Sequence, residues 1–301
     1  MTAARLRSPG ARSDAGLGVL ALLVCLVGGC ATGRPPQTPQ PPSAAARSGP
    51  SEATPPAPPT SDLPRIEAQD SRLSAALAAL VAHPTAEAHR RVAAEYSRLH
   101  VFDYAFDHLK SALKLAPHDA AAFEGLARIW RDWGFPALAL GEAYRAVYYA
   151  PRSAEVQNTL GTVLYAVGDL QEAERRFELA RALDPDAAYV LSNLCYLSVM
   201  RGAAEQALDD CRRAVTLAPT VTAARNNLAL AYAALGRQDL AEREFLAAGD
   251  RASGHFNIGV IHLAAGEYAQ AAVAFSVACR EQPLLEGACD RAHQASLLAK
   301  K

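Results

Sequence analysis

The stretch AEVQNTLGTVLYAVGDLQEAERRFELARALDPDA, residues 154–187, decides the fold, because it can be laid on its neighbours at a period of 34 residues. Each copy has small residues at positions eight, twenty and twenty-seven, and most have a glycine at fifteen and a proline at thirty-two. Small residues let two antiparallel helices approach closely, the glycine ends the first helix and the proline stops the second. The sequence therefore predicts helical hairpins over residues 86–119, 120–153, 154–187, 188–221, 222–251 and 252–285, the fifth being about four residues short.

This pattern resembles the tetratricopeptide repeat family over about residues 86–285. The tryptophan usual at position four is replaced, for example by Phe123, Leu191 and His255. The resemblance implies an all-α, superhelical solenoid of about six hairpins. Residues 65–84 and 286–301 are expected to form capping helices that cover the two open ends of the stack.

The amino terminus has the organisation of a secretory signal. Arginines precede an apolar run from about Leu17 to Val27, which is shorter than the roughly 20 residues that a spanning helix needs. Residues Val27 to Cys30 resemble the lipobox of bacterial lipoproteins, which implies a signal peptide over residues 1–29 and a diacylglycerol on Cys30. The alternative is an ordinary signal peptide with a cysteine beside its cleavage site. Ala31 is not the aspartate that favours inner-membrane retention in the lipoproteins it resembles, so we expect the outer membrane, with the periplasmic face favoured over the cell surface.

Residues 30–64 are expected to form a tether. The segment is rich in proline, serine and threonine and has almost no large apolar residues, so it cannot bury enough surface to offset its ordering entropy. Fully extended, it would reach up to roughly 100 Å from the lipid. A proline-rich stretch can also be a ligand for proteins with aromatic grooves.

Four cysteines follow the signal and Cys30. An even number in an exported protein predicts two disulfides, Cys195–Cys211 within one hairpin and Cys279–Cys289 across the turn at Pro283. The alternative is that all four are small buried core residues.

A ligand is expected on the inner face of the stack. In the resembling family this face is lined by positions two, five, six, nine, twelve and thirteen of each first helix. In the first two units these positions carry several arginines, so the groove is expected to begin basic. The candidate binding residues are Arg90, Arg128, Arg131, Asn158, Tyr165, Tyr189, Asn193, Tyr196, Asn226, Asn227, Phe256 and Asn257.

Asparagine recurs at position six in Asn193, Asn227 and Asn257. These residues resemble the asparagine ladders with which some tetratricopeptide proteins hold an extended peptide, since an amide both donates and accepts hydrogen bonds. The alternative is that each amide only bonds water or the neighbouring helix. The tyrosines and arginines of the groove favour a protein or peptide ligand.

The sequence carries no recognisable catalytic constellation. It has no phosphate-binding glycine loop, no H-E-x-x-H and no paired-cysteine zinc spacing, and His255 with His262 is expected to be repeat filler. We therefore expect no enzyme, no cofactor and no metal. Removal of the signal changes 30 basic and 31 acidic residues to 27 and 30. The resulting net charge near minus three argues against nucleic acid.

Two functions fit these features. The first is a membrane-anchored adaptor that binds a protein or extended peptide in its groove and assists assembly of a secretin or pilus complex, as pilotin-type lipoproteins of similar architecture do. The second is an envelope scaffold that recruits peptidoglycan hydrolases or synthases.

Overall fold

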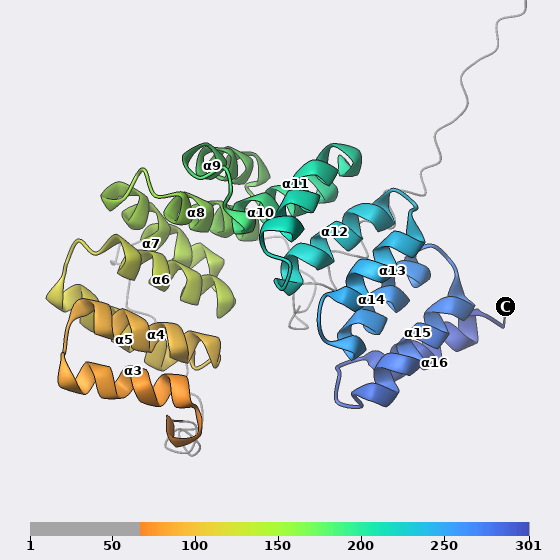
Figure 1. Cartoon of the computed structure of the whole chain (residues 1–301), viewed down its shortest axis with the longest axis horizontal. Helices are drawn as coiled ribbons and strands as arrows, with labels where there is room; N and C mark the ends of the chain where they lie inside the picture. The colour runs from red at the N-terminus through yellow and green to blue at the C-terminus, as the bar shows by residue number, and fades with distance from the viewer. Residues whose placement is uncertain (1–66, 301) are drawn as a thin grey trace, which may run out of the picture. The chain divides into compact units, whose positions relative to one another are not determined.

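The computed structural model describes residues 67–300 of the chain and is built from α-helices. Within this range the helices α3–α16 follow one another with no β-strand, so the predicted all-α fold of tandem helical hairpins is confirmed (Figure 1). The described residues divide into two compact units, residues 67–186 and 187–300, called here the N-terminal and C-terminal units. The expected signal peptide, the lipidation site Cys30 and the proline-rich segment lie outside the described residues.

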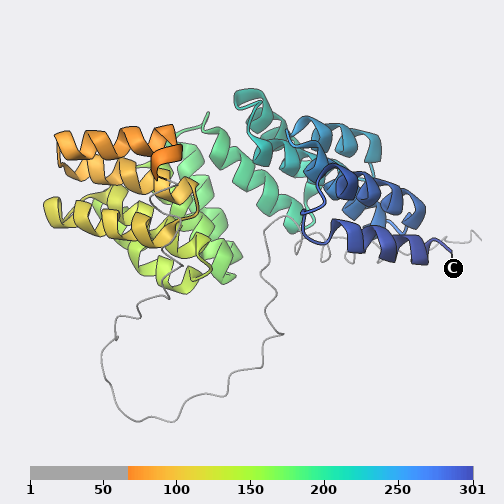
Figure 2. The same ribbon diagram turned by 90° about the horizontal axis from the view of Figure 1, so that it is seen from below.

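The N-terminal unit holds one single helix and three hairpins. Consecutive helices pack side by side in the two views of Figures 1 and 2, and each first helix also contacts the first helix of the next hairpin. The helices are α3 (Ser71–Ala82), then the pairs α4 (Ala86–Arg98) and α5 (Phe102–Leu115), α6 (Ala120–Asp132) and α7 (Pro136–Tyr149), and α8 (Ala154–Val167) and α9 (Leu170–Leu183).

The C-terminal unit has the reverse arrangement, three hairpins followed by a single helix. Its pairs are α10 (Ala188–Met200) and α11 (Ala204–Leu217), α12 (Thr222–Ala234) and α13 (Gln238–Ala247), and α14 (Arg251–Ala264) and α15 (Tyr268–Glu281), followed by α16 (Ala288–Leu298). Helix α13 has 10 residues where α11 and α15 have 14, and this accounts for the short fifth repeat.

Position fifteen of each repeat takes a left-handed backbone conformation. The glycines at this position have φ between +70° and +93°, as in Gly168 at +92°. In the first repeat the position is occupied by His100, whose φ is +58° and which is the one non-glycine residue with positive φ in the described chain. The position in the repeat therefore determines the left-handed turn, and glycine adopts that conformation at the lowest cost in conformational energy.

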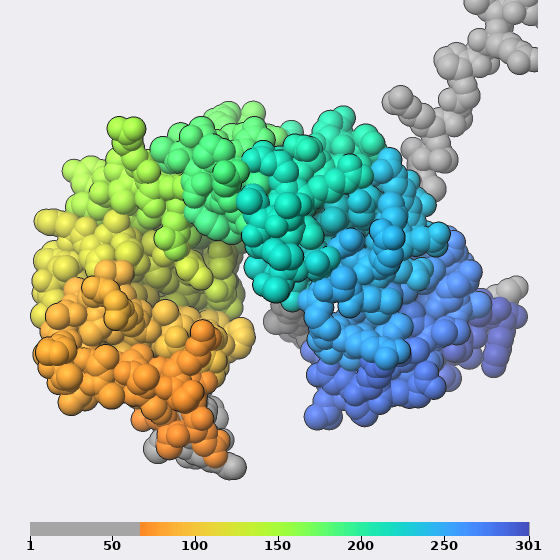
Figure 3. Space-filling model, in the orientation of Figure 1, coloured from red at the N-terminus to blue at the C-terminus, as the bar shows by residue number. Residues whose placement is uncertain are grey.

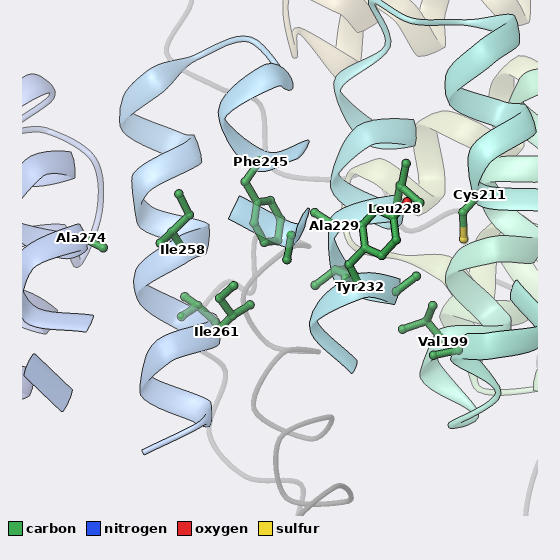
Figure 4. Packing of buried hydrophobic residues seen from close by; sticks show 14 of the residues in the cluster. Val199, Cys211, Leu228, Ala229, Tyr232, Phe245, Ile258, Ile261 and Ala274 are labelled. Atoms are coloured by element: carbon green, nitrogen blue, oxygen red, sulfur yellow. The ribbon is translucent and has the colours of Figure 1, made fainter. Parts of the chain in front are cut away.

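Each unit has its own hydrophobic core. In the N-terminal unit Leu73 of α3 is fully buried and belongs to the same core cluster as Val92 and Tyr96 of α4, so α3 covers the end of the first hairpin. Figure 3 shows the hairpins of this unit as adjacent bands of successive colour. In the C-terminal unit the core continues from Cys195 to Ala295 of α16, with the aromatic rings of Tyr232, Phe245 and Phe275 inside it (Figure 4 labels the first two).

None of the helices in residues 67–300 has the length and apolar character needed to cross a membrane.

Candidate functional site

A cleft of about 400 Å³ lies between α4 and α6 in the N-terminal unit, and Leu109 of α5 and Glu155 of α8 each add one residue to its lining. It lies on the face of the first helices where the sequence predicts a ligand. The cleft is lined by Arg90, Ala93, Ala94, Ser97, Arg98, Leu109, Ala121, Glu124, Gly125, Arg128, Ile129, Asp132 and Glu155.

Three arginines of the cleft differ in how firmly they are paired. Arg90 Nε lies 2.8 Å from Asp119 Oδ2, and Arg98 Nη2 lies 2.7 Å from Asp70 Oδ1. Arg128 Nη1 comes no closer than 3.6 Å to Glu124 Oε1, and its side chain is 54% exposed. Arg128 is therefore the cation of this cleft that is most open to a ligand.

Arg98 has a structural task at the edge of the cleft. It donates a hydrogen bond to Asp70, whose carboxylate also accepts from the backbone N–H groups of Arg72 and Leu73 at the start of α3. The hydrogen bond from Arg98, with those from the backbone, holds the pKa of Asp70 below its ordinary value. Arg98 thus joins α4 to the capping end of α3.

Glu124 is the buried acid of the cleft. The Thr159 hydroxyl donates to its Oε1 at 2.6 Å, and its residue exposure is only 6%. Burial raises the pKa of Glu124, and the nearby Arg128 guanidinium opposes that shift. The cleft therefore places an exposed cation beside a desolvated carboxyl group.

The first two units contribute Arg90, Arg98 and Arg128 to this cleft together with Glu124 and Asp132, and the third unit adds Glu155. The arginines expected in the first two units are therefore accompanied by acids that sequence reasoning missed. The acids stand at positions five, thirteen and two, so the same positional rule could have found them. Arg131 is not in the cleft lining; its Nη1 donates to Thr162 Oγ1 at 2.6 Å and joins α6 to α8.

Position six faces the preceding first helix. Asn227 is buried, and its Nδ2 donates to the backbone oxygen of Ser192 at 3.0 Å and to its hydroxyl at 2.9 Å. Thr159 makes the corresponding bond from position six to Glu124 in the N-terminal unit. For Asn227 the structure agrees with the second alternative, because its amide group donates to the neighbouring helix.

The remaining candidates lie outside the cleft. Asn158, Tyr165, Tyr189, Asn193 and Tyr196 each already take part in an interaction with another residue, and Tyr189 is 44% exposed.

Near the carboxyl end, Phe256 packs with its ring 5.4 Å from Phe275, and the Arg291 guanidinium lies 5.5 Å from its ring centre. Asn226 has its buried Oδ1 without a hydrogen-bond partner, and Asn257 is half-buried. The cleft thus brings together Arg90 and Arg128 among the residues that the sequence nominated.

His262, expected to be filler, is a buried link in the C-terminal unit. Its Nε2 lies 3.0 Å from Glu242 Oε1 of α13, and its Nδ1 lies 2.6 Å from Glu267 Oε2 at the start of α15. The contact with Glu242 joins two hairpins, so sequence spacing could not reveal it. No group of three or more histidine, cysteine, aspartate or glutamate residues between 67 and 300 is placed to hold a metal ion.

Both cysteine pairs are bonded in the structure. Cys195 and Cys211 join α10 to α11 with Cα atoms 5.0 Å apart, and both residues are fully buried. Cys279 and Cys289 join α15 to α16, also with Cα atoms 5.0 Å apart. The second bond attaches the last helix to the hairpin that it covers.

No protein-family model and no curated protein sequence matches this chain. Solved structures do resemble it. A chain of the APC/C hetero-tetramer Cut9–Hcn1 has a TM-score of 0.65 at 19% identity over 75% of this chain, which spans 46% of the length of that one. PilW, described as a widely conserved type IV pilus biogenesis factor, has a TM-score of 0.58 at 22% identity over 69% of this chain and 97% of its own. PilF of Pseudomonas aeruginosa has a TM-score of 0.54 at 21% identity over 72% of this chain and 97% of its own.

At these identities the likeness concerns the fold. The three neighbours are tetratricopeptide-repeat structures, and their stacked hairpins correspond to those described above. Residues 67–300 therefore have the tetratricopeptide-repeat fold that the sequence predicts.

Proposed function

We propose that this protein is an adaptor of the cell envelope that binds an extended segment of another protein in the cleft of α4, α6 and α8. The observation that carries the proposal is the cleft itself, about 400 Å³ in volume and formed by the first helices α4 and α6 with Glu155 at the start of α8. Its exposed Arg128 suits a carboxylate of the partner, and the acids Asp132 and Glu155 suit a basic side chain. The partner segment accordingly carries both charges.

The process we propose is assembly of a secretin or pilus complex. Support comes from the fold, since a type IV pilus biogenesis factor matches over 97% of its own length with a TM-score of 0.58. The matched chains extend over most of the described residues. This supports the pilus role over the peptidoglycan-enzyme scaffold, for which the structure offers no specific observation.

We further propose that Cys30 carries the lipid anchor and that the protein resides on the periplasmic face of the outer membrane. The support is the sequence Val27-Gly28-Gly29-Cys30 after a short apolar run. A single acyl chain binds a membrane only marginally, so durable attachment requires the two or more chains of a lipoprotein.

Crosslinking capture from membranes tests the adaptor proposal. The full chain, its Arg128→Glu variant and an Arg175→Glu control are expressed in the native host and purified after crosslinking. Arg175 is a matched control because it is 65% exposed and pairs with a glutamate on its own helix, outside the cleft. We expect an envelope protein whose capture falls about tenfold or more with Arg128→Glu, the effect of losing one charge-assisted contact.

The control variant is expected to capture the same protein at the parental level. Equal capture by all three chains would show that the cleft is not the binding site. A captured peptidoglycan enzyme in place of a secretin or pilus protein would overturn the proposed process while leaving the cleft assignment intact.

A further inference from the structure

Helix α7 presents an apolar and aromatic face to solvent. Leu138 is 48% exposed, Tyr144 is 47% exposed and Tyr148 is 78% exposed. These residues and Gly141 fall at spacings of three and four along the helix, so they form one continuous stripe. We call Leu138, Gly141, Tyr144 and Tyr148 the α7 stripe.

The repeat itself shows that the fold does not require this stripe. Second helices 34 residues apart place equivalent residues at equivalent positions. In α5 the positions of Gly141, Tyr144 and Tyr148 carry Asp107, Lys110 and Lys114, and in α9 they carry Arg175, Glu178 and Ala182. Five of these six residues are charged, so α7 departs from its neighbours on both sides at these three positions. At the position of Leu138, α5 carries Tyr104 and α9 carries Glu172.

Gly141 is a second departure on the same face. A Cβ atom built on Gly141 would have no atom within 4 Å, and its φ is not positive, so neither packing nor backbone conformation demands glycine there. A glycine inside an exposed helix costs about 1 kcal/mol relative to alanine. It leaves a depression between Leu138 and Tyr144 in which another backbone can approach closely.

We propose that the α7 stripe binds the proline-rich segment of its own chain, residues 32–64. Proline rings pack on tyrosine faces, and a polyproline helix loses little conformational entropy on binding. The segment contains prolines at intervals of three in Pro36, Pro39 and Pro42. With three residues per turn and about 3.1 Å per residue, these rings would share one side of a polyproline helix at intervals of about 9 Å.

The spacing of the stripe matches that of the prolines. Gly141 and Tyr148 are seven residues apart on an α-helix, which puts them about 10 Å apart along its axis and only about 20° apart around it. One proline can therefore enter the depression at Gly141 while the proline three residues away packs on Tyr148. Leu138 and Tyr144 border this path on its two sides.

The length of chain before the described residues permits this contact. The described chain begins at Glu67, next to α3, and α3 is linked to α7 through the packed helices α4 and α6. Neighbouring packed helices lie about 8–10 Å apart, so the stripe is roughly 30 Å away. Pro42 precedes Glu67 by 25 residues, which could span about 75 Å when extended.

Site-specific photocrosslinking in the full chain in native membranes tests the proposal. A benzoyl-phenylalanine replaces Tyr148, and in a control chain it replaces Lys114 at the same position of α5. We expect the Tyr148 probe to join peptides from residues 32–64 within one chain, and the Lys114 probe to join none of them. Crosslinks from Tyr148 to a second copy, to another protein or to nothing would each overturn the proposal.

Cleavage by an arginine-specific protease gives an independent measurement. Arg47 lies in the middle of the segment, so binding to α7 should protect it. A chain with Tyr144→Lys and Tyr148→Lys takes the residues that α5 has at these positions, and it is therefore expected to fold as the parent does. If the segment is bound to α7 in nine-tenths of the parent molecules, cleavage at Arg47 should be about tenfold faster in this variant. Equal cleavage rates in the two chains would refute binding at the stripe.

Discussion

Replacement of Gly161 by alanine should destabilise the N-terminal unit, although alanine is the better helix former. A Cβ atom at this position would lie 2.6 Å from Cε1 and 2.7 Å from Cδ1 of Phe177. The Phe177 ring is 2% exposed, so it has no open space into which it could move. The added methyl group therefore has to displace a packed ring or separate α8 from α9.

The magnitude follows from two opposing effects. Overpacking a core by one methyl group costs about 1–3 kcal/mol, and contacts this short favour the upper part of that range. The gain in helix propensity from glycine to alanine is about 1 kcal/mol. We expect a net loss of about 1–2 kcal/mol in the free energy of unfolding.

Gly141→Ala in α7 is the matched control. The same substitution there brings the Cβ atom within 4 Å of nothing, so only the propensity gain remains. This variant should be more stable than the parent by about 0.5–1 kcal/mol. The two changes thus have opposite signs for the same chemical replacement in the same unit.

Urea unfolding followed by circular dichroism gives the free energy of unfolding of the three chains, which are compared with the same dependence of that free energy on urea concentration. A second test combines Gly161→Ala with Phe177→Leu, which replaces the ring that the methyl group meets by a smaller side chain. The double variant should therefore lose less stability than the sum of the two single losses. If Gly161→Ala were as stable as Gly141→Ala, or the two changes at 161 and 177 were additive, close approach at this position would not explain its glycine.

Three further predictions concern the covalent and ionisable groups. Cys195→Ala with Cys211→Ala should lower stability under oxidising conditions by about 3 kcal/mol, the chain-entropy value for a loop of this size, and should have no such effect on reduced chains. Burial lowers the pKa of both His89 and His108, whose Nδ1 atoms lie 3.0 Å apart. The unfolded chain therefore binds protons more readily than the folded one, so the folded state should lose stability as the pH falls below 6.5. A melting temperature that does not change with pH in this range would contradict this. Labelled palmitate should enter the parent chain and be absent from Cys30→Ser, which should also leave the membrane fraction; retention of label would refute lipidation at Cys30.

The helical hairpins could be predicted from sequence because their determinants are local and recur. Small residues and glycines at a period of 34 indicate where two helices meet and where the first one ends. His100 shows the limit of reading single residues, since it occupies the left-handed position at φ +58° without being glycine. The position in the repeat determines the turn there, and the residue type follows it in the other copies.

The contacts of the groove positions were harder to predict than their composition, because these contacts connect one repeat to the next. Glu124 bonds Thr159 and Ser192 bonds Asn227, in both cases 35 residues away, from position five to position six of the following unit. A list of residue types at groove positions contains all four of them. It does not say that position six points at the preceding helix, so the sequence left open whether a polar residue there bonds a ligand or its neighbour.

The Cys195–Cys211 bond and the Gly161–Phe177 contact are two solutions to the same packing problem. Each pair occupies positions eight and twenty-four of its hairpin. Gly259 and Phe275 repeat the glycine–phenylalanine contact, since a Cβ atom built on Gly259 would lie 2.7 Å from the ring of Phe275. In the third and sixth repeats, where the ring at position twenty-four lies this close, position eight is glycine, whereas in the short fifth repeat Phe245 stands at position twenty-four with Ala229 at position eight. Where both positions carry cysteine, the helices come within 5.0 Å between Cα atoms and a covalent bond replaces the ring. The disulfide therefore falls at the place where two other hairpins of the described chain bring a ring against the glycine of the facing helix.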